Sequence, residues 1–446
     1  MPVISSPRTA AVLAFALLWQ PGYAADPVPA HSADDDIWRI DLGETLHPDG
    51  ERSEQVGAES LESLDQVEPR DPALPATEPA LPDEAEAALL ADYQDAVNEV
   101  LNTSNAYDPR LSELYFDLAT ALHQMGDLDR AIKAYDQSLY IVRVNRGLYS
   151  VHQADMLRGL ASCYESLQQW QEASDRYRHL LWLHQQSLGG DSPMLIPVIE
   201  EVGSWYLKAY NNDPSRPSSY LAESERLTRF GLYLTGHHEH TSLDDTLALL
   251  RNLAAGQYLW AQHLRRNPPL ESGFDFPGEP TNRVRASRDL DMAISSSYRV
   301  GRSAYEKLVE IVTLTPDLPA EEVAAAMAEL GDWHLRYGYQ SAADESYRHA
   351  YQYLAQHGDT ASADDFFANP TLIGPLWPVS RTTDVVADVT VDHRGRATDL
   401  DIQTVGDEAL RQRVQRNLRA ARFRPSLHNG EPETAPYRLV QRVAVQ

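Results

Sequence analysis

Two stretches of equal length dominate the chain, LSELYFDLATALHQMGDLDRAIKAYDQS at residues 111–138 and QADMLRGLASCYESLQQWQEASDRYRHL at residues 153–180. Small and large apolar side chains recur at matching places, and Ala131 returns 42 positions later as Ala173. Because residues four and seven places apart share one face of a helix, each copy predicts a pair of helices with apolar stripes. Gly126 suits the sharp turn between the first two helices. A fixed period in this range is typical of helical repeats.

This pattern resembles the tetratricopeptide repeat, a helix–turn–helix module. The residues that carry the resemblance are Tyr115, Leu118, Ala119, Gly126, Ala131, Tyr135 and Ser138 in the first copy, and Leu157, Leu160, Ala161, Tyr164, Ala173 and Tyr177 in the second. Gln168 replaces the turn glycine in the second copy, and the long period resembles the subclass with extended helices. The resemblance implies a mainly α-helical solenoid that binds peptides or proteins, so we expect no catalytic activity and no cofactor.

Weaker copies extend the helical pattern in both directions. Gly189 stands 42 positions after Gly147 and introduces a third copy, whereas Gly331 and Gly338 belong to a last one. We therefore predict a repeat domain over residues 85–356.

The composition narrows the classes of function. The formal net charge of −28 disfavours a sequence-independent nucleic-acid binder, because such proteins need a basic footprint. Cys163 is the single cysteine, so internal disulfides are excluded. Its place on a repeat helix favours a small packed hydrophobe over a redox thiol. We expect protein or peptide partners and no nucleic acid.

Residues 1–24 resemble a secretory signal peptide. Arg8 precedes a short apolar run from Ala10 to Trp19, and Ala24 is the expected cleavage position. The run is shorter than the ~20 residues that a spanning helix needs. We expect export to the periplasm with no membrane span after signal removal. An uncleaved inner-membrane anchor is the alternative.

Residues 25–84 are predicted to be an acidic disordered segment. Carboxylates and prolines dominate it and apolar periodicity is missing, so it buries too little surface to offset its ordering entropy. A flexible spacer is the favoured interpretation. Calcium binding by Asp34, Asp35 and Asp36 is disfavoured, because the cluster lacks the alternating ligands and central glycine of a calcium loop.

Beyond a predicted linker at residues 357–376, the pattern changes from helical to alternating. Apolar and polar residues alternate from Val385 to Val391, which predicts a strand with one buried face. A return strand at residues 397–404, a helix at residues 410–421 and a closing strand follow. Residues 377–446 are therefore predicted to form a small α+β domain of β-β-α-β order.

This order resembles the TonB C-terminal domain. The features that carry the resemblance are Pro375-Leu376-Trp377-Pro378, Val389–Gly395, Arg422-Phe423-Arg424-Pro425 and Gly430. Trp377 replaces the usual tyrosine, and the acidic spacer departs from the Pro/Lys-rich one of that family. The resemblance implies a last strand that pairs with an extended peptide, such as a segment of an outer-membrane transporter. The predicted strand-pairing edge comprises Tyr437, Leu439, Gln441 and Val443. A structural domain, or a dimer through the same edge, is the alternative.

The resemblance to tetratricopeptide repeats also implies a peptide-binding groove along the first helix of each pair. Carried over by position, the predicted groove residues are Phe116, Thr120, His123, Arg158, Ser162 and Glu165. Phe116 either anchors a peptide or packs on a neighbouring repeat. Arg158 either pairs with a peptide carboxylate or lies on a solvated face.

The densest histidine cluster is His237-His238-Glu239-His240. Imidazoles and carboxylates are suitable metal ligands, but adjacent residues converge poorly on one tetrahedral centre. A polar loop between helices is the favoured interpretation. His334 falls on the core-facing slot that corresponds to Tyr164, so we predict that it packs inside.

These observations predict an exported periplasmic scaffold or adaptor that binds one partner in a helical groove and another along its last strand, with envelope transport as the setting. A membrane-anchored TonB-type energy transducer is one alternative. A metal-binding protein or enzyme that uses the His237 region is the other.

Overall fold

The computed structural model describes residues 84–238, 241–268, 282–358, 360–374, 382–403 and 408–444. It is mainly helical and divides into two compact units within one helix, at Val202. The first unit includes residues 84–202 and 233–238, and the second includes residues 203–232 and the described residues from Thr241 onward. No described helix is both long and apolar enough to span a bilayer.

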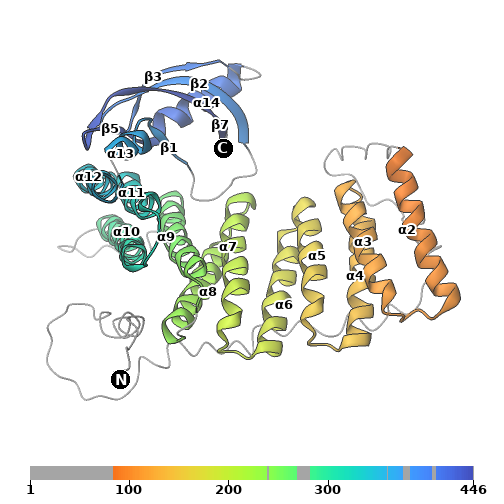
Figure 1. Cartoon of the computed structure of the whole chain (residues 1–446). Coiled ribbons are helices and arrows are strands. Elements are labelled where there is room, and N and C mark those ends of the chain that lie inside the picture. Colours follow the sequence, from red (N-terminus) through yellow and green to blue (C-terminus); the bar gives the residue numbers. More distant parts are fainter. Residues whose placement is uncertain are drawn as a thin grey trace, which may run out of the picture. The chain divides into compact units, whose positions relative to one another are not determined.

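The first unit is a row of helix pairs. Its helices are α2 (Glu84–Thr103), α3 (Arg110–Gln124), α4 (Leu128–Arg146), α5 (Ala154–Ser166) and α6 (Trp170–Leu188), followed by the start of α7 (Ile196–Asn212). Figure 1 shows α3 to α6 standing side by side with alternating direction. The two predicted helix pairs are therefore confirmed.

The repeated residues fill the space between these helices, as predicted. Ala119, Ala131, Ala161 and Ala173 are completely buried, so their helices approach closely. Cys163 is buried as well, and this burial raises the pKa of its thiol to about 11. A thiol in this environment is a packed hydrophobe rather than a reactive group.

The turns between paired helices use a left-handed residue. Gly126 (φ 80°) joins α3 to α4, and Gly338 (φ 83°) occupies the corresponding place in the last pair. Gln168 has the same left-handed backbone (φ 60°) between α5 and α6, although its side chain disfavours it. The turn geometry is therefore kept where the sequence departs from the repeat pattern.

The second unit is also largely helical. Its helices are the remainder of α7, most of α8 (Ser218–His237), α9 (Leu243–Arg266), α10 (Asn282–Leu314), α11 (Ala320–Arg336) and α12 (Gln340–His357). Two glycines permit close packing, because a Cβ at Gly301 would overlap the Trp333 ring and a Cβ at Gly331 would overlap the Tyr347 ring. Trp333 donates to the carbonyl of Tyr298 (3.1 Å), so its buried indole nitrogen is satisfied.

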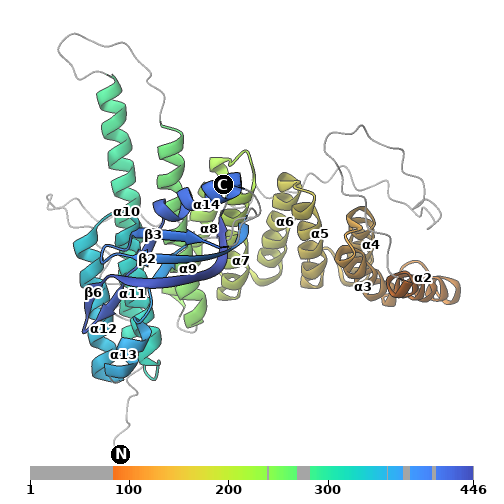
Figure 2. The same cartoon turned by 90° about the horizontal axis from the view of Figure 1, so that it is seen from above.

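A small sheet module completes this unit. Antiparallel strands β2 (Thr382–Val391), β3 (Ala397–Ile402) and β7 (Ala435–Ala444) form a sheet in the order β3-β2-β7, which Figure 2 shows with β2 in the middle. Helix α14 (Glu408–Ala420) covers the face to which Val385 and Val389 point. These elements follow the predicted β-β-α-β order.

The stretch at residues 357–376 is not a plain linker, which corrects the prediction. It contains helix α13 (Thr360–Phe366) and strand β1 (Thr371–Ile373), which pairs with β4 (Arg422–Arg424). Strands β5 (Ser426–His428) and β6 (Glu431–Glu433) also pair. Strands of three residues are too short to show an alternating pattern, so the sequence alone did not reveal them.

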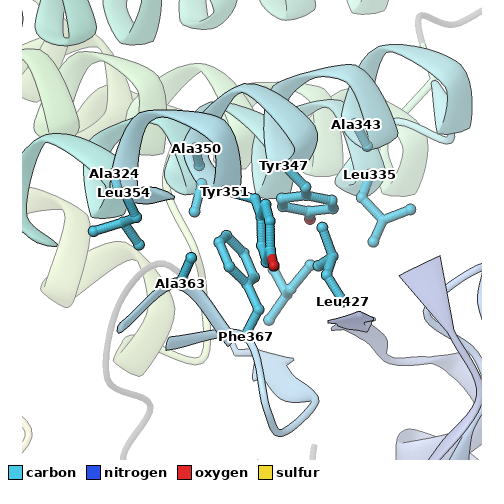
Figure 3. Close-up of a cluster of buried hydrophobic side chains, with 12 residues drawn as sticks. Ala324, Leu335, Ala343, Tyr347, Ala350, Tyr351, Leu354, Ala363, Phe367 and Leu427 are labelled. Atoms are coloured by element: carbon cyan, nitrogen blue, oxygen red, sulfur yellow. The ribbon is translucent and has the colours of Figure 1, made fainter. Parts of the chain in front are cut away.

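The module shares a core with the last helical pair. Tyr351 of α12 packs on Phe367, which follows α13, and Leu427 of β5 joins the same cluster (Figure 3). The amide of Leu427 also donates to the carbonyl of Phe367 (3.1 Å). Helix α12 and the module are therefore one packed body. The predicted signal peptide, residues 25–83 of the predicted acidic segment and Pro375 to Pro378 lie outside the described residues, and Glu84 begins α2.

Candidate functional site

The predicted groove residues of the first repeat lie on α3, but two of them are engaged within the repeat. The Phe116 ring packs edge-on against Tyr135 of α4, with ring centres 5.7 Å apart. The Thr120 hydroxyl contacts the Phe116 carbonyl (2.9 Å) and the Tyr135 hydroxyl (3.2 Å). The Phe116 ring therefore packs against the second helix of its own pair.

Arg158 of α5 is held by two carboxylates. Its guanidinium donates to both oxygens of Glu201 on α7 (2.7 and 2.8 Å) and to Asp155 (3.0 Å). These carboxylates stabilise the charged form and raise the pKa of Arg158. A bidentate arginine–carboxylate pair has fixed geometry, so Arg158 ties the second repeat to the next helix. A peptide carboxylate would have to compete with Glu201.

The remaining predicted groove residues are Glu165, His123 and Ser162, and they differ in whether their side chains form hydrogen bonds within the protein. Tyr177 forms a side-chain hydrogen bond with Glu165. Among the described residues, the side chains of His123 and Ser162 form no hydrogen bond or ion pair. Both are partly exposed on first helices. His123 and Ser162 are therefore the two predicted groove residues whose polar groups remain available to a ligand.

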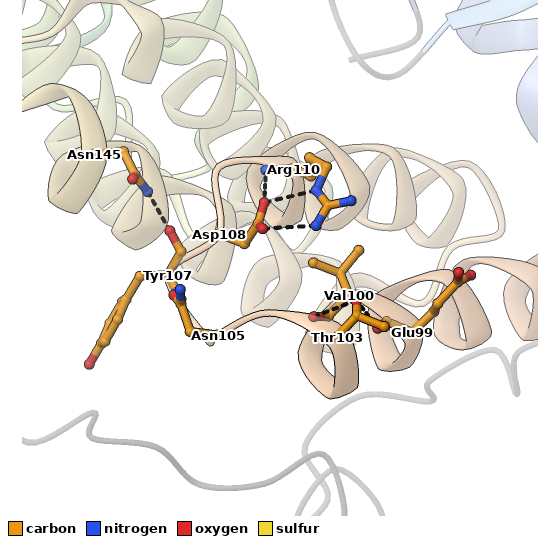
Figure 4. A network of polar contacts seen from close by, with 8 residues as sticks. All are labelled: Glu99, Val100, Thr103, Asn105, Tyr107, Asp108, Arg110 and Asn145. Carbon is orange, nitrogen blue, oxygen red and sulfur yellow. Dashed lines mark hydrogen bonds and ion pairs between the residues drawn. The ribbon is translucent and has the colours of Figure 1, made fainter.

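A polar network fixes the loop between α2 and α3 (Figure 4). Asp108 accepts from the amide (3.0 Å) and guanidinium of Arg110, and these hydrogen bonds hold the pKa of Asp108 well below its ordinary value. Asn145 of α4 donates to the carbonyl of Tyr107 (2.8 Å). The network leaves the Tyr107 ring exposed beside Tyr140, with centres 6.2 Å apart. No repeat signal marks these residues, so the sequence analysis did not find them.

The predicted strand-pairing edge lies on β7. This strand pairs with β2 along its length, with Tyr437 opposite Val389 and Leu439 opposite Ala387, and Gln441 and Val443 continue the register. In the order β3-β2-β7, β7 is an outer strand of the sheet within the described residues. Leu439 is completely buried, so its side chain belongs to the module core. What β7 offers to a partner is its backbone edge.

The histidine cluster shows no metal geometry in the part of the chain that the structure describes. His237 contacts the carbonyl of Tyr233 (2.8 Å) and His238 contacts that of Asp191 (3.0 Å). Glu239 and His240 lie outside the described residues, and within them no three His, Cys, Asp or Glu side chains are placed to share a metal ion. The other predicted histidine, His334, is buried as expected and contacts the Tyr298 hydroxyl (2.8 Å).

The second unit contains a cavity of about 480 Å³ that the sequence analysis missed. It lies between α9, α11, Tyr305 of α10 and the end of β1. Arg251 pairs with Glu329 through two hydrogen bonds (2.9 and 3.1 Å), and Arg336 donates to the carbonyl of Gly374 (2.7 Å). Most of its charged groups therefore connect elements of the wall to one another.

The strongest of these connections involves Asp332. Its carboxylate accepts from both sides of the Arg424 guanidinium (2.6 and 3.0 Å) and from the Tyr347 hydroxyl (2.8 Å). All three side chains are largely removed from water, and the burial of Tyr347 beside this carboxylate raises its pKa. The ion pair joins α11 to β4. Because its two residues are 92 positions apart in the sequence, no local pattern predicts it.

Comparison with known proteins bears on the first unit. Residues 110–186 match the family model of the Tetratricopeptide repeat. No curated protein matches the chain in sequence. The matched residues comprise α3 to α5 and nearly all of α6, which are the two helix pairs described above. The chain therefore contains tetratricopeptide repeats, which suggest a protein–protein interaction scaffold with protein partners.

Proposed function

We propose that the chain is a non-catalytic scaffold that binds a segment of a partner protein along α3 and α5. The match of residues 110–186 to the repeat family is the observation that carries this proposal. His123 and Ser162 support it, because their partly exposed polar groups are not used inside the protein. Arg158 and Glu201 keep the helices in place, so the groove is preorganised and loses little entropy when it binds.

A photo-crosslinking amino acid at position 162 would test this use of the groove in cells of the native host. We expect Ser162 variants to give discrete crosslinked partner proteins. The matched control is the same amino acid at Ser187, which is exposed on the second helix of the pair. Equal crosslinking from both positions would contradict a partner in the groove.

The second part of the proposal concerns the sheet module. Strand β7 is ten residues long and lies at an edge of its sheet, and such an edge can recruit an extended peptide. Its resemblance to the TonB C-terminal domain favours an envelope setting, with a transporter segment as the partner. Amide hydrogen exchange along Ala435–Ala444 should slow when that peptide binds, and unchanged exchange would contradict strand pairing.

We propose that this scaffold is periplasmic, because residues 1–24 resemble a secretory signal peptide. A retained anchor would instead favour an energy transducer of the TonB type. Sequencing the N-terminus of the protein from its native host separates the two. A start near Ala25 in the soluble fraction supports the exported adaptor, and an intact N-terminus in the inner membrane supports the transducer.

A further inference from the structure

A second polar pocket, here named the arginine pocket, lies in the second unit between the α11–α12 turn and the β2–β3 turn. Its volume is about 290 Å³, and its lining residues are Leu335, Gly338, Gln340, Arg394, Arg396 and Arg422. Three arginines and no acidic residue are therefore among its lining residues. Among the described residues, these three arginines form no side-chain hydrogen bond or ion pair.

The backbone of the β2–β3 turn holds two of these arginines in place. One carboxylate oxygen of Asp392 accepts from the amides of Arg394 (2.9 Å) and Arg396 (2.8 Å). Between them, the Gly395 carbonyl accepts from the amide of Phe423 in β4 (2.9 Å). A Cβ at Gly395 would overlap the Phe423 carbonyl, so only glycine allows the turn to approach β4 this closely.

The third arginine differs sharply from its neighbour on the same strand. Arg424 is largely buried and neutralised by Asp332, as described above. Arg422 lies two positions earlier in β4, on the same side of the strand, and lacks such a carboxylate among the described residues. The sheet module therefore uses one arginine for its attachment to α11 and presents the other to the arginine pocket.

The neighbouring helix ends do not change the sign of the charge. The C-terminus of α11 and the N-terminus of α12 both reach the arginine pocket, so their dipoles oppose each other. The amide group of Gln340 donates to Asp344 (2.9 Å). The pocket is positive because of its arginines, although the whole chain carries a net charge of −28. At physiological salt, charges beyond ~8 Å are largely screened, so the local arginines decide what approaches.

We propose that the arginine pocket binds a segment of a partner protein that carries several Asp or Glu side chains in succession. Arg394 and Arg396 are exposed, and exposed ion pairs contribute only about 0–1 kcal/mol each. A single small oxyanion is therefore held weakly, whereas several carboxylates on one chain add their contributions. The site does not depend on the groove of α3 and α5 and extends the scaffold to a second, acidic partner segment.

Fluorescence anisotropy with a labelled peptide of about eight glutamates and the full chain tests the proposal. We expect saturable binding that weakens as salt rises from about 0.05 M to about 0.3 M. The triple variant Arg394→Gln/Arg396→Gln/Arg422→Gln should bind at least about tenfold more weakly. The matched control Arg411→Gln/Arg416→Gln/Arg419→Gln changes the net charge equally at exposed positions of α14 and should bind within about twofold of the wild type.

Three results would overturn the proposal: no binding of the peptide, equal loss in both triple variants, or full displacement of the peptide by millimolar inorganic phosphate. The last would assign the pocket to a single oxyanion. If Arg422→Gln disturbs folding, the double variant Arg394→Gln/Arg396→Gln, with both residues exposed, decides the question alone. Crosslinking at Ser162 is independent of this result, so failure here leaves the groove proposal standing.

Discussion

At the scale of single residues, Gln168 shows how the fold overrides a local preference. It adopts the left-handed backbone that glycine supplies at Gly126 and Gly338. We expect Gln168→Gly to raise the free energy of unfolding by about 1 kcal/mol, because the left-handed backbone costs a side-chain-bearing residue about that much. Urea denaturation of the variant and the wild type measures this difference in the free energy of unfolding. Gly126→Gln is the reciprocal control and should destabilise, and a destabilised Gln168→Gly would contradict the explanation.

His334 makes stability depend on pH. Its burial lowers the pKa of the imidazole to about 4, and the nearby Arg302 acts in the same direction. An unfolded histidine titrates near 6.5, so the unfolded chain binds more protons between these values and stability falls as pH decreases from about 6.5 to 4. The full shift corresponds to at most about 3 kcal/mol.

The variant His334→Asn removes this titration and provides the measurement. We expect its free energy of unfolding to fall less than that of the wild type between pH 7 and pH 4, although it is less stable at pH 7 because of lost packing. Parallel pH profiles of the two proteins would show that His334 is not buried in its neutral form.

At the scale of elements, glycines let helices approach where large rings pack between them. Gly301→Ala should destabilise by about 1–3 kcal/mol, because the added methyl group overlaps the buried Trp333 ring. This cost exceeds the gain in helix propensity of about 1 kcal/mol. The measurement is the midpoint of thermal unfolding of Gly301→Ala. The control is Gly190→Ala, which adds a methyl group in open space. Equal midpoints for both variants would contradict the close packing.

The elements also show what the sequence could predict. Repetition at 42 positions predicted α3 to α6, and alternation predicted β2, because each pattern extends over many residues. The short strands β1 and β4 were missed since three residues carry no period. The assignment of His123 and Ser162 to a binding groove stays a prediction, and the ion pair of Arg158 with Glu201 was not predicted. The only signal was a Glu 43 positions after the Arg, one position more than the 42-residue repeat.

At the scale of the whole molecule, the buried ion pair of Asp332 and Arg424 fastens the sheet module to the last helix pair. Asp332→Asn should lower the free energy of unfolding by about 3 kcal/mol, because it leaves Arg424 largely buried without a compensating charge. The double variant Asp332→Leu/Arg424→Met should be less damaging than Asp332→Asn. Denaturant unfolding with equal stability for Asp332→Asn and the wild type would show that the pair contributes nothing.

The central claim is that the groove of α3 and α5 binds a peptide. The most direct test is to select peptides from a random library against the full chain and to measure their dissociation constants. We expect the double variant His123→Arg/Ser162→Arg to weaken binding at least about tenfold. The control Gln137→Arg/Ser187→Arg adds the same side chains to exposed positions of α4 and α6 and should change binding less than about twofold. Equal affinities in the wild type and both variants would contradict a binding groove on the first helices.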